Sequence, residues 1–181
     1  MSGRGVSLMG CLLAFTIALG AVGTARANGD VEAAGSALVL ALPAVSAGAS
    51  LIHRDSDGFV QLAGSAALAL GITYGLKYVV NAERPNGGDR SLPSGHASLS
   101  FCSAEFLRRR YGLAWGAPAY AVAGFVGYSR VDAREHYTAD VMAGALIGAV
   151  SAWALTRPYE HLSVDVTVSE GSCGLVVAYI W

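Results

Sequence analysis

The sequence predicts an all-α, membrane-type helical bundle of about five to six helices, with a short C-terminal β-hairpin. Apolar residues make up 54% of the 181 residues and charged residues only 14%. The mean hydropathy of +0.47 is high for a soluble protein. The apolar residues form long runs that are separated by short charged segments, as in a helical membrane bundle.

Residues 1–27 predict an export signal or a first membrane helix. Arg4 precedes an apolar core over 9–22, and Ala-Arg-Ala at 25–27 has the small-x-small pattern of a signal peptidase site. Cleavage would release a chain that starts at Asn28, whereas retention would add one span. Both interpretations send the chain into or across a membrane.

Four apolar runs follow, each about long enough to span a thin bilayer at about 1.5 Å per residue: 35–52, 58–76, 112–129 and 141–156. They are rich in Ala and Gly, which suits close helix packing. A fifth, shorter helix is expected from 93 to 110. A secreted soluble bundle with unusually apolar helices is the alternative.

The C-terminal segment has a different pattern. Residues 163–168 and 174–181 alternate or are rich in β-branched side chains, and a turn-like Ser-Glu-Gly-Ser-Cys-Gly segment joins them. This pattern predicts a β-hairpin. The chain therefore divides into 1–27, a helical domain over 28–160, and a tail over 161–181.

Successive helices place their loops at alternate ends of the bundle. Loops 81–96 and 130–136 are expected at one end, and loops 53–57 and 108–112 at the other. The second end carries five arginines: Arg54, Arg108, Arg109, Arg110 and Arg157. By the positive-inside tendency this end is cytoplasmic, so the first end faces the periplasm or the cell exterior.

Charge and cysteine usage exclude several functional classes. The net charge is −1 and no basic stripe occurs, which argues against a nucleic-acid partner. Cys11, Cys102 and Cys173 form no CxxC pattern and no Cys/His cluster of a zinc site. No carboxylate cluster suits a metal either, so we expect no metal and no cofactor.

The charged segment 129–140 lies between two apolar runs. His136 and Asp140 are four residues apart at an expected helix start, so we expect them on one face within hydrogen-bond reach. An Asp behind an imidazole fixes its tautomer and leaves the other nitrogen as a nucleophile or base. Arg130, on the loop leading in, offers donors that match phosphate oxygens. Taken alone, the pair fits a capping Asp beside a surface His better than a catalytic pair.

A second polar segment covers 92–98. Pro93 and Gly95 bend the chain, and Ser94 is a good N-cap for the following helix. The free N–H groups of such a helix start attract anions, and His96 lies beside them. Alone, this is an ordinary helix entry.

Lys77 and Arg84 bring further positive charge to the same end of the bundle. Taken alone, they fit cations that reach toward lipid headgroups. Together with Arg130, however, they make three cations beside two histidines, an acid and a helix N-terminus. This set predicts an oxyanion site with two acid–base groups.

These residues form three motifs that resemble those of the type 2 phosphatidic acid phosphatase family, in the family's order: Lys77-x6-Arg84-Pro85, Pro93-Ser94-Gly95-His96 and Ser129-Arg130-x5-His136-x3-Asp140. Its superfamily includes bacterial class A acid phosphatases and vanadium haloperoxidases. The resemblance covers 77–140, about a third of the chain. The segment between Pro85 and Pro93 is shorter than the family usually has, which leaves substrate size open.

The resemblance implies a role for each motif residue. His136 would attack phosphorus and form a phosphohistidine, and Asp140 would orient it. His96 would protonate the leaving oxygen. Five residues would bind the phosphate oxygens: Lys77, Arg84, Ser94, Gly95 and Arg130. No metal or cofactor is implied, and His53 and His161 lie outside the site.

The implied activity is that of a metal-independent phosphatase in the helical domain, hydrolysing a lipid phosphate or pyrophosphate. The implied location is the inner membrane, with the active site facing the periplasm. The alternative is a periplasmic acid phosphatase for soluble phosphomonoesters. A haloperoxidase of this size is not expected, and an intact catalytic set argues against a scaffold protein. The natural substrate and the oligomeric state stay open.

Overall fold

The computed structural model describes residues 28–159, 161–169 and 172–180. The expected leader over 1–27 lies outside them. The helices are α2 (Asn28–Ile52), α3 (Ser56–Val80), α4 (Gly95–Tyr111), α5 (Leu113–Asp132) and α6 (Thr138–Leu155), and the strands are β1 (His161–Ser169) and β2 (Ser172–Ile180). Five helices in the described part agree with the predicted all-α class.

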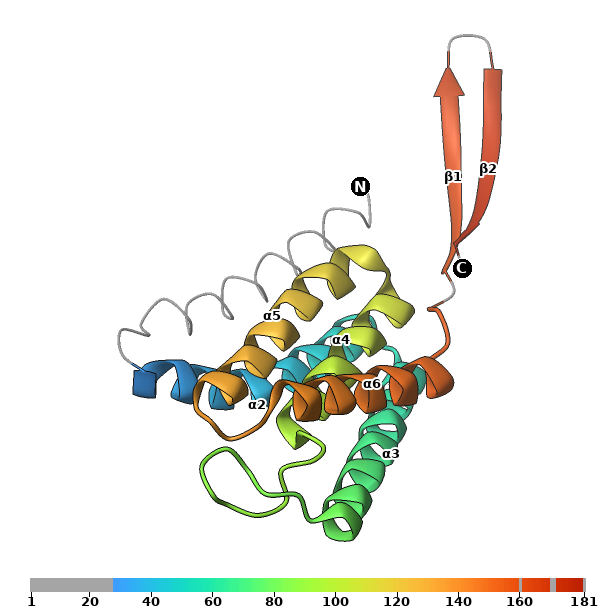
Figure 1. The fold of residues 1–181 in the computed structure, drawn as a ribbon. Helices are drawn as coiled ribbons and strands as arrows, with labels where there is room; N and C mark the ends of the chain where they lie inside the picture. Colours follow the sequence, from blue (N-terminus) through green and yellow to red (C-terminus); the bar gives the residue numbers. More distant parts are fainter. Residues whose placement is uncertain (1–27, 160, 170–171, 181) are drawn as a thin grey trace.

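Helix α4 is the centre of the bundle, and the other four helices pack on it (Figure 1). It buries large apolar side chains such as Phe106 and Leu107, which join Trp115 of α5 and Leu62 of α3 in one core cluster. It also buries several serines along the same length. A helix that is buried on all sides by its neighbours holds both of its ends in fixed positions.

Glycines let α6 approach α4 closely. A Cβ added at Gly148 would lie 2.0 Å from the Ser98 carbonyl oxygen, and one at Gly144 would lie 2.3 Å from the Ser94 carbonyl oxygen. Only a hydrogen fits at either position. This contact sets the start of α6 against the start of α4, where the Ser94 N–H donates to the Asp140 carbonyl at 2.9 Å.

The helices alternate in direction, so their polar connections gather at two ends. The loop after α3 meets the loop after α5, where Arg84 contacts Glu135. Helices α3 and α5, which precede these two loops, both start at the opposite end of the bundle. The structure therefore brings together the two segments, 81–96 and 130–136, that the sequence placed at one end.

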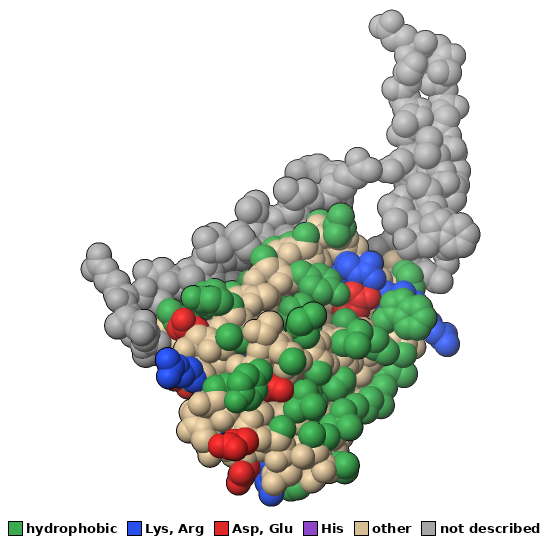
Figure 2. All heavy atoms as spheres, in the orientation of Figure 1, with side chains coloured by type: hydrophobic (Ala, Val, Ile, Leu, Met, Phe, Trp, Pro, Cys, Tyr) green, Lys and Arg blue, Asp and Glu red, His purple; other side chains and the backbone are tan. Residues whose placement is uncertain are grey.

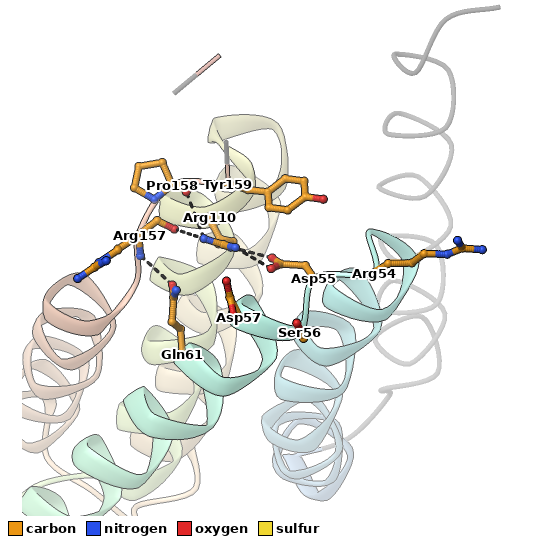
Figure 3. A pocket seen from close by; sticks show the side chains of 9 residues that line it. All are labelled: Arg54, Asp55, Ser56, Asp57, Gln61, Arg110, Arg157, Pro158 and Tyr159. Atoms are coloured by element: carbon orange, nitrogen blue, oxygen red, sulfur yellow. Dashed lines mark hydrogen bonds and ion pairs between the residues drawn. The ribbon is translucent and has the colours of Figure 1, made fainter. Parts of the chain in front are cut away.

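The opposite end is closed by a buried ion pair (Figure 3). Asp55, the N-cap of α3, accepts two hydrogen bonds from the Arg110 guanidinium at 2.6 and 2.7 Å and one from the Tyr111 hydroxyl at 2.8 Å. Arg110 also donates to the Arg157 carbonyl at 2.9 Å. Burial raises the pKa of Asp55, but these donors and the Gly58 N–H outweigh it and lower that pKa. Helices α3 and α4 and the segment after α6 are thus joined at one point.

Apolar side chains cover the outside of the bundle. Figure 2 shows them spread over α3 and α6, with charged side chains at the edges of this face. The large exposed ones on these two helices include Phe59, Val60, Leu68, Ile72, Leu76, Val79, Met142, Leu146, Val150 and Trp153. Water does not favour such a surface, whereas a lipid environment does.

Among the described residues, three helical segments are long and apolar enough to cross a membrane: Val31–Ile52, Ser56–Val80 and Thr138–Leu155. Their mean hydropathies are 1.8, 1.5 and 1.5. The predicted fourth run over 112–129 forms helix α5, which is not among these three, so its crossing of a membrane stays a prediction. Helix α5 covers this run, but its Gly and Tyr residues and Pro118 dilute its apolar character.

Several helix boundaries differ from the predicted ones. Helix α2 starts at Asn28, seven residues before the expected start at Gly35. The expected start marked the beginning of the apolar run, whereas the helix also includes the more polar residues before it. Arg130 lies in the last turn of α5 and not on a loop. His136 precedes α6, which begins at Thr138, so only Asp140 belongs to that helix.

The tail contains β1 and β2, which pair antiparallel with His161 opposite Ile180 and Ser169 opposite Ser172. These strands overlap the two segments, 163–168 and 174–181, on which the hairpin was expected. That this hairpin is stable, and what it does, stay predictions. The candidate site is built from residues 77–140 and does not include the hairpin.

Candidate active site

Lys77 lies in the last turn of α3 and is buried. Its ammonium group donates to the Arg90 carbonyl at 2.6 Å and to the Ser91 carbonyl at 3.3 Å. These two bonds tie the loop that follows α3 back onto the end of that helix. The lysine therefore has a fixed place at the base of the site.

Arg84 lies on the loop after α3, and the loop itself orients it. The loop closes through the Arg84 N–H, which donates to the Gly88 carbonyl at 2.6 Å. Gly87 has a positive φ of 83°, which favours glycine at this turn. The guanidinium donates from Nε to the Asp89 carbonyl at 3.0 Å, and its Nη1 contacts the Glu135 carboxylate.

Arg130 is the most deeply buried of the three cations, at 3% exposure. It donates from Nη2 to the Glu32 carbonyl at 2.7 Å and from Nε to the Ser129 hydroxyl at 3.2 Å. Its Nη1 also lies 3.8 Å from the Glu32 carboxylate. Close packing of α2 on α5 makes this possible, because a Cβ at Gly35 would lie 1.9 Å from Ser129 Oγ.

Ser94 caps α4, as predicted from the sequence. Its hydroxyl accepts a hydrogen bond from the Ala97 N–H at 3.4 Å. Gly95 is the first residue of the helix, and His96 follows on its first turn, half-buried. Burial lowers the pKa of His96, and the charges of Arg130, Lys77 and Arg84 lower it further, while Glu135 opposes them. All three cations therefore act on this imidazole.

His136 and Asp140 lie side by side, but they do not share the direct hydrogen bond that the sequence predicted. The distance from His136 Nδ1 to Asp140 Oδ2 is 3.7 Å. Ser91 lies between them: its hydroxyl donates to Asp140 Oδ2 at 2.5 Å and is 3.5 Å from His136 Nδ1. Asp140 Oδ2 also accepts from the Tyr137 N–H at 2.9 Å. The expected pair is therefore a group of three.

Sequence reasoning did not identify Ser91, because this residue belongs to none of the three motifs. Its only local signal is its place between Arg84 and Pro93, in a loop that must return to the start of α4. The residue becomes significant only because α6 carries Asp140 to the same point.

The environment keeps His136 uncharged. Burial, then the positive charges of Lys77 and Arg84, lower the pKa of His136 to about 4, and Asp140 only partly opposes them. The imidazole is therefore neutral over most of the pH range. A neutral imidazole in a cationic pocket has a free electron pair for nucleophilic attack.

The eight predicted site residues thus come from α3, α4, α5, α6 and two loops, and the fold gathers them at one end of the bundle. Three fixed cations and a helix N-terminus suit a tetrahedral oxyanion, and two imidazoles can attack and transfer protons. Among the described residues, no group of three His, Cys, Asp or Glu side chains could hold a metal ion. His53 lies at the opposite end, where its ring stacks on Tyr111 at 5.0 Å between centroids.

Known proteins share the helical region that carries this candidate site. The profile of the PAP2 superfamily matches residues 58–162, more than half of the chain. The chain belongs to this superfamily. The match includes α3 to α6 and all eight predicted site residues.

Individual relatives share the same region. The chain is 32% identical to lipid A 4'-phosphatase of Helicobacter pylori strain J99 over 131 residues, which is 66% of each protein. It is 29% identical to lipid A 1-phosphatase of the same strain, over 60% of this chain and 61% of that one. With lipid A 1-phosphatase of Porphyromonas gingivalis the identity is 35%, over 45% of this chain and 19% of that protein. The matched part thus spans less than two thirds of these relatives.

A solved structure shares the fold. The crystal structure of Aquifex aeolicus LpxE superposes with a TM-score of 0.53 at 24% sequence identity, covering 64% of this chain and 81% of that one. At this identity the likeness concerns the helical architecture alone.

Proposed function

We propose that this chain is a phosphatase that removes phosphate from a phosphorylated lipid through a phosphohistidine intermediate, without a metal. One observation carries the proposal: three cations act on His96 and two of them, Lys77 and Arg84, also act on His136, at the polar end of a bundle with an apolar outer surface. The relatives named above are lipid A phosphatases, which supports a lipid substrate.

In the proposed first step, Nε2 of neutral His136 attacks phosphorus while the bond from phosphorus to the leaving oxygen breaks. His96 gives its proton to that oxygen. In the second step, a water molecule gives a proton to His96 and attacks phosphorus, the P–N bond breaks, and inorganic phosphate leaves. His136 is then neutral again, and His96 is again protonated.

Ser91 and Asp140 support the first step by orienting the imidazole. The Ser91 hydroxyl donates to Asp140, so its oxygen can accept a hydrogen bond from the Nδ1–H of His136. This arrangement favours the neutral tautomer with its proton on Nδ1, which would leave Nε2 free to attack. Asp140 then stabilises the positive charge that develops on His136.

The cations do the work that a metal ion does in other phosphatases. Lys77, Arg84 and Arg130 would bind the nonbridging oxygens, and Ser94 and the Gly95 N–H would add hydrogen bonds. Such fixed donors stabilise the charge of a five-coordinate phosphorus without reorganising during the reaction. Backbone carbonyls hold all three cations in place: those of Arg90 and Asp89 on the loop after α3 hold Lys77 and Arg84, and that of Glu32 in α2 holds Arg130.

We place the protein in the inner membrane with its site at the periplasmic face. The distribution of exposed and half-buried arginines favours this orientation slightly, because the far end carries four of them and the site end three. Those at the far end are Arg54, Arg108, Arg109 and Arg157, and those at the site end are Arg84, Arg90 and Arg134. Residues 28–160 would form the phosphatase domain, 1–27 an export signal or first span, and 161–181 a tail. A lipid headgroup could then enter while its acyl chains stay in the bilayer.

A periplasmic acid phosphatase for soluble phosphomonoesters is the second candidate. The weakly apolar α5 favours it, since only three helices of the described part of the chain are long and apolar enough to cross a membrane. Fractionation separates the two candidates: a lipid phosphatase stays in the membrane pellet until detergent is added, whereas the soluble enzyme appears in osmotic-shock fluid.

The proposal is tested by phosphate release from a panel of substrates in EDTA. The purified full-length protein in detergent is given phosphatidate, phosphatidylglycerol phosphate, a lipid A phosphate, undecaprenyl pyrophosphate and nitrophenyl phosphate, beside the His136→Ala variant. We expect release from at least one lipid by the wild type and a loss of at least about 1,000-fold in the variant. Equal release by both proteins, or activity that needs added magnesium, would contradict the proposal.

A further inference from the structure

Two carboxylates share the arginines of the proposed phosphate site. Glu32 interacts with Arg130, as described above, and Glu135 contacts Arg84. Glu135 is partly buried, with 27% of its side chain exposed, and its second oxygen accepts from the Asn86 amide at 3.0 Å. The proposed site therefore contains two carboxylates beside its cations. Binding a phosphate anion does not require these negative charges.

The backbone of Glu135 is also held in place, by a turn that follows α5. Its backbone N–H donates to the Arg130 carbonyl at 3.0 Å, and the next residue, His136, donates to the same carbonyl at 3.2 Å. These bonds fix the backbone of Glu135 beside that of the proposed nucleophile. The carboxylate itself is held by Arg84 and Asn86.

The carboxylate of Glu135 lies within the proposed phosphate site. It contacts Arg84, a proposed ligand of the nonbridging oxygens, and the next residue is His136, the proposed nucleophile. Its negative charge also acts on His96, the proposed proton donor to the leaving oxygen, in the direction opposite to the three cations. A substrate that reaches both Arg84 and His96 therefore brings its own negative charge close to this carboxylate.

We propose that Glu135 makes this site selective for phosphate monoesters with an uncharged leaving group over diphosphates, an inference that rests on the proposed function. When a monoester is cleaved, the leaving group is a neutral alcohol or sugar hydroxyl, which Glu135 does not repel. When a diphosphate is attacked at its terminal phosphorus, the leaving group is itself a phosphate ester. Its negative charge then lies close to the carboxylate, and like charges in a partly buried site repel.

Substitutions at position 135 can distinguish the effect of the negative charge from the effect of the contact with Arg84. Glu135→Gln keeps an oxygen that accepts from Arg84 but removes the charge. Glu135→Asp keeps the charge on a shorter side chain. Glu83→Gln makes the same chemical change at an exposed residue next to Arg84 in sequence, and it serves as the matched control.

The test compares farnesyl phosphate with farnesyl diphosphate, which share one prenyl chain. Initial phosphate release by the purified full-length protein in detergent gives kcat/KM for each. We expect the wild type to prefer the monophosphate and Glu135→Gln to raise the diphosphate-to-monophosphate ratio about three- to tenfold. Glu135→Asp and Glu83→Gln should keep the wild-type ratio to within about twofold, even if the shorter side chain lowers both rates.

An unchanged ratio in Glu135→Gln would overturn the inference, whether or not the overall rate falls, because a residue that only orients Arg84 affects both substrates alike. A wild type that prefers the diphosphate would overturn it too, while leaving the proposed phosphatase function intact. A wild type that releases phosphate from neither farnesyl ester nor from any lipid of the panel would contradict the proposed function itself.

Discussion

The hydroxyl of Ser91 holds Asp140 and faces the imidazole of His136. Ser91→Ala should therefore lower kcat about tenfold or more and change KM little, because the phosphate-binding cations keep their places while the imidazole loses its orientation. Steady-state kinetics on a lipid phosphate measure this. Ser151→Ala is the matched control, since the Ser151 hydroxyl bonds only the Ile147 carbonyl of its own helix in the described structure. A rise in KM at constant kcat would point to substrate binding instead.

Two imidazoles with lowered pKa values predict an acidic optimum. The nucleophile must be neutral, and His136 is neutral above pH 4 or so, given its pKa of about 4. The acid must be protonated, and burial and the cations hold the pKa of His96 below its ordinary 6.5. As pH rises through the lowered pKa of His96, the rate should therefore fall. The profile of kcat/KM against pH reports both groups in the free enzyme.

The titration of the substrate phosphate overlaps this range, so a variant is needed to assign the descending limb. Glu135 raises the pKa of His96 against Arg130, Lys77 and Arg84. Glu135→Gln should therefore move the descending limb to lower pH, while the ionisation of the substrate stays the same. A limb at the same pH in both proteins would show that His96 does not set it.

At the scale of elements, the contact of α4 with α6 positions the site. Gly148→Ala would place a methyl group 2.0 Å from the Ser98 carbonyl oxygen, so the helices must move apart. We expect a loss of about 1–3 kcal/mol, seen as a lower Tm in detergent, together with reduced activity. Gly71→Ala is the control, because a Cβ added at Gly71 would have no atom within 4 Å outside its own stretch of helix backbone. This variant should leave Tm unchanged or raise it. Equal Tm values for both variants would contradict this packing.

The sequence predicts these elements well where apolar runs are continuous, and less well where charge enters a helix. Arg130 was expected on a loop because charged residues follow it, yet its backbone completes α5 and its side chain is buried by α2. The Ser94 cap was predicted because capping depends on adjacent residues. Ser91 and Glu135 could not be, because their partners lie 45 to 51 residues away in sequence.

At the scale of the whole molecule, the proposed orientation has a direct test. With Cys11 and Cys173 replaced by serine, Asp89→Cys marks the site end and Leu113→Cys marks the far end, where Leu113 is 72% exposed. In intact spheroplasts an impermeant maleimide should label only Asp89→Cys, and lysis should add Leu113→Cys. The reverse pattern would put the site in the cytoplasm, and labelling of both before lysis would mean that the helices do not span the membrane.

The central claim is that His136 carries the phosphoryl group. The most direct measurement is mass spectrometry of peptides after an alkaline quench of the enzyme reacting with a lipid phosphate in EDTA, since phosphohistidine survives alkali. The claim predicts a phosphoryl group on His136 in the wild type and in His96→Ala, and none in His136→Ala. Phosphate release by the wild type with no phosphorylated His136 at any quench time, or with the phosphoryl group on another residue, would contradict it.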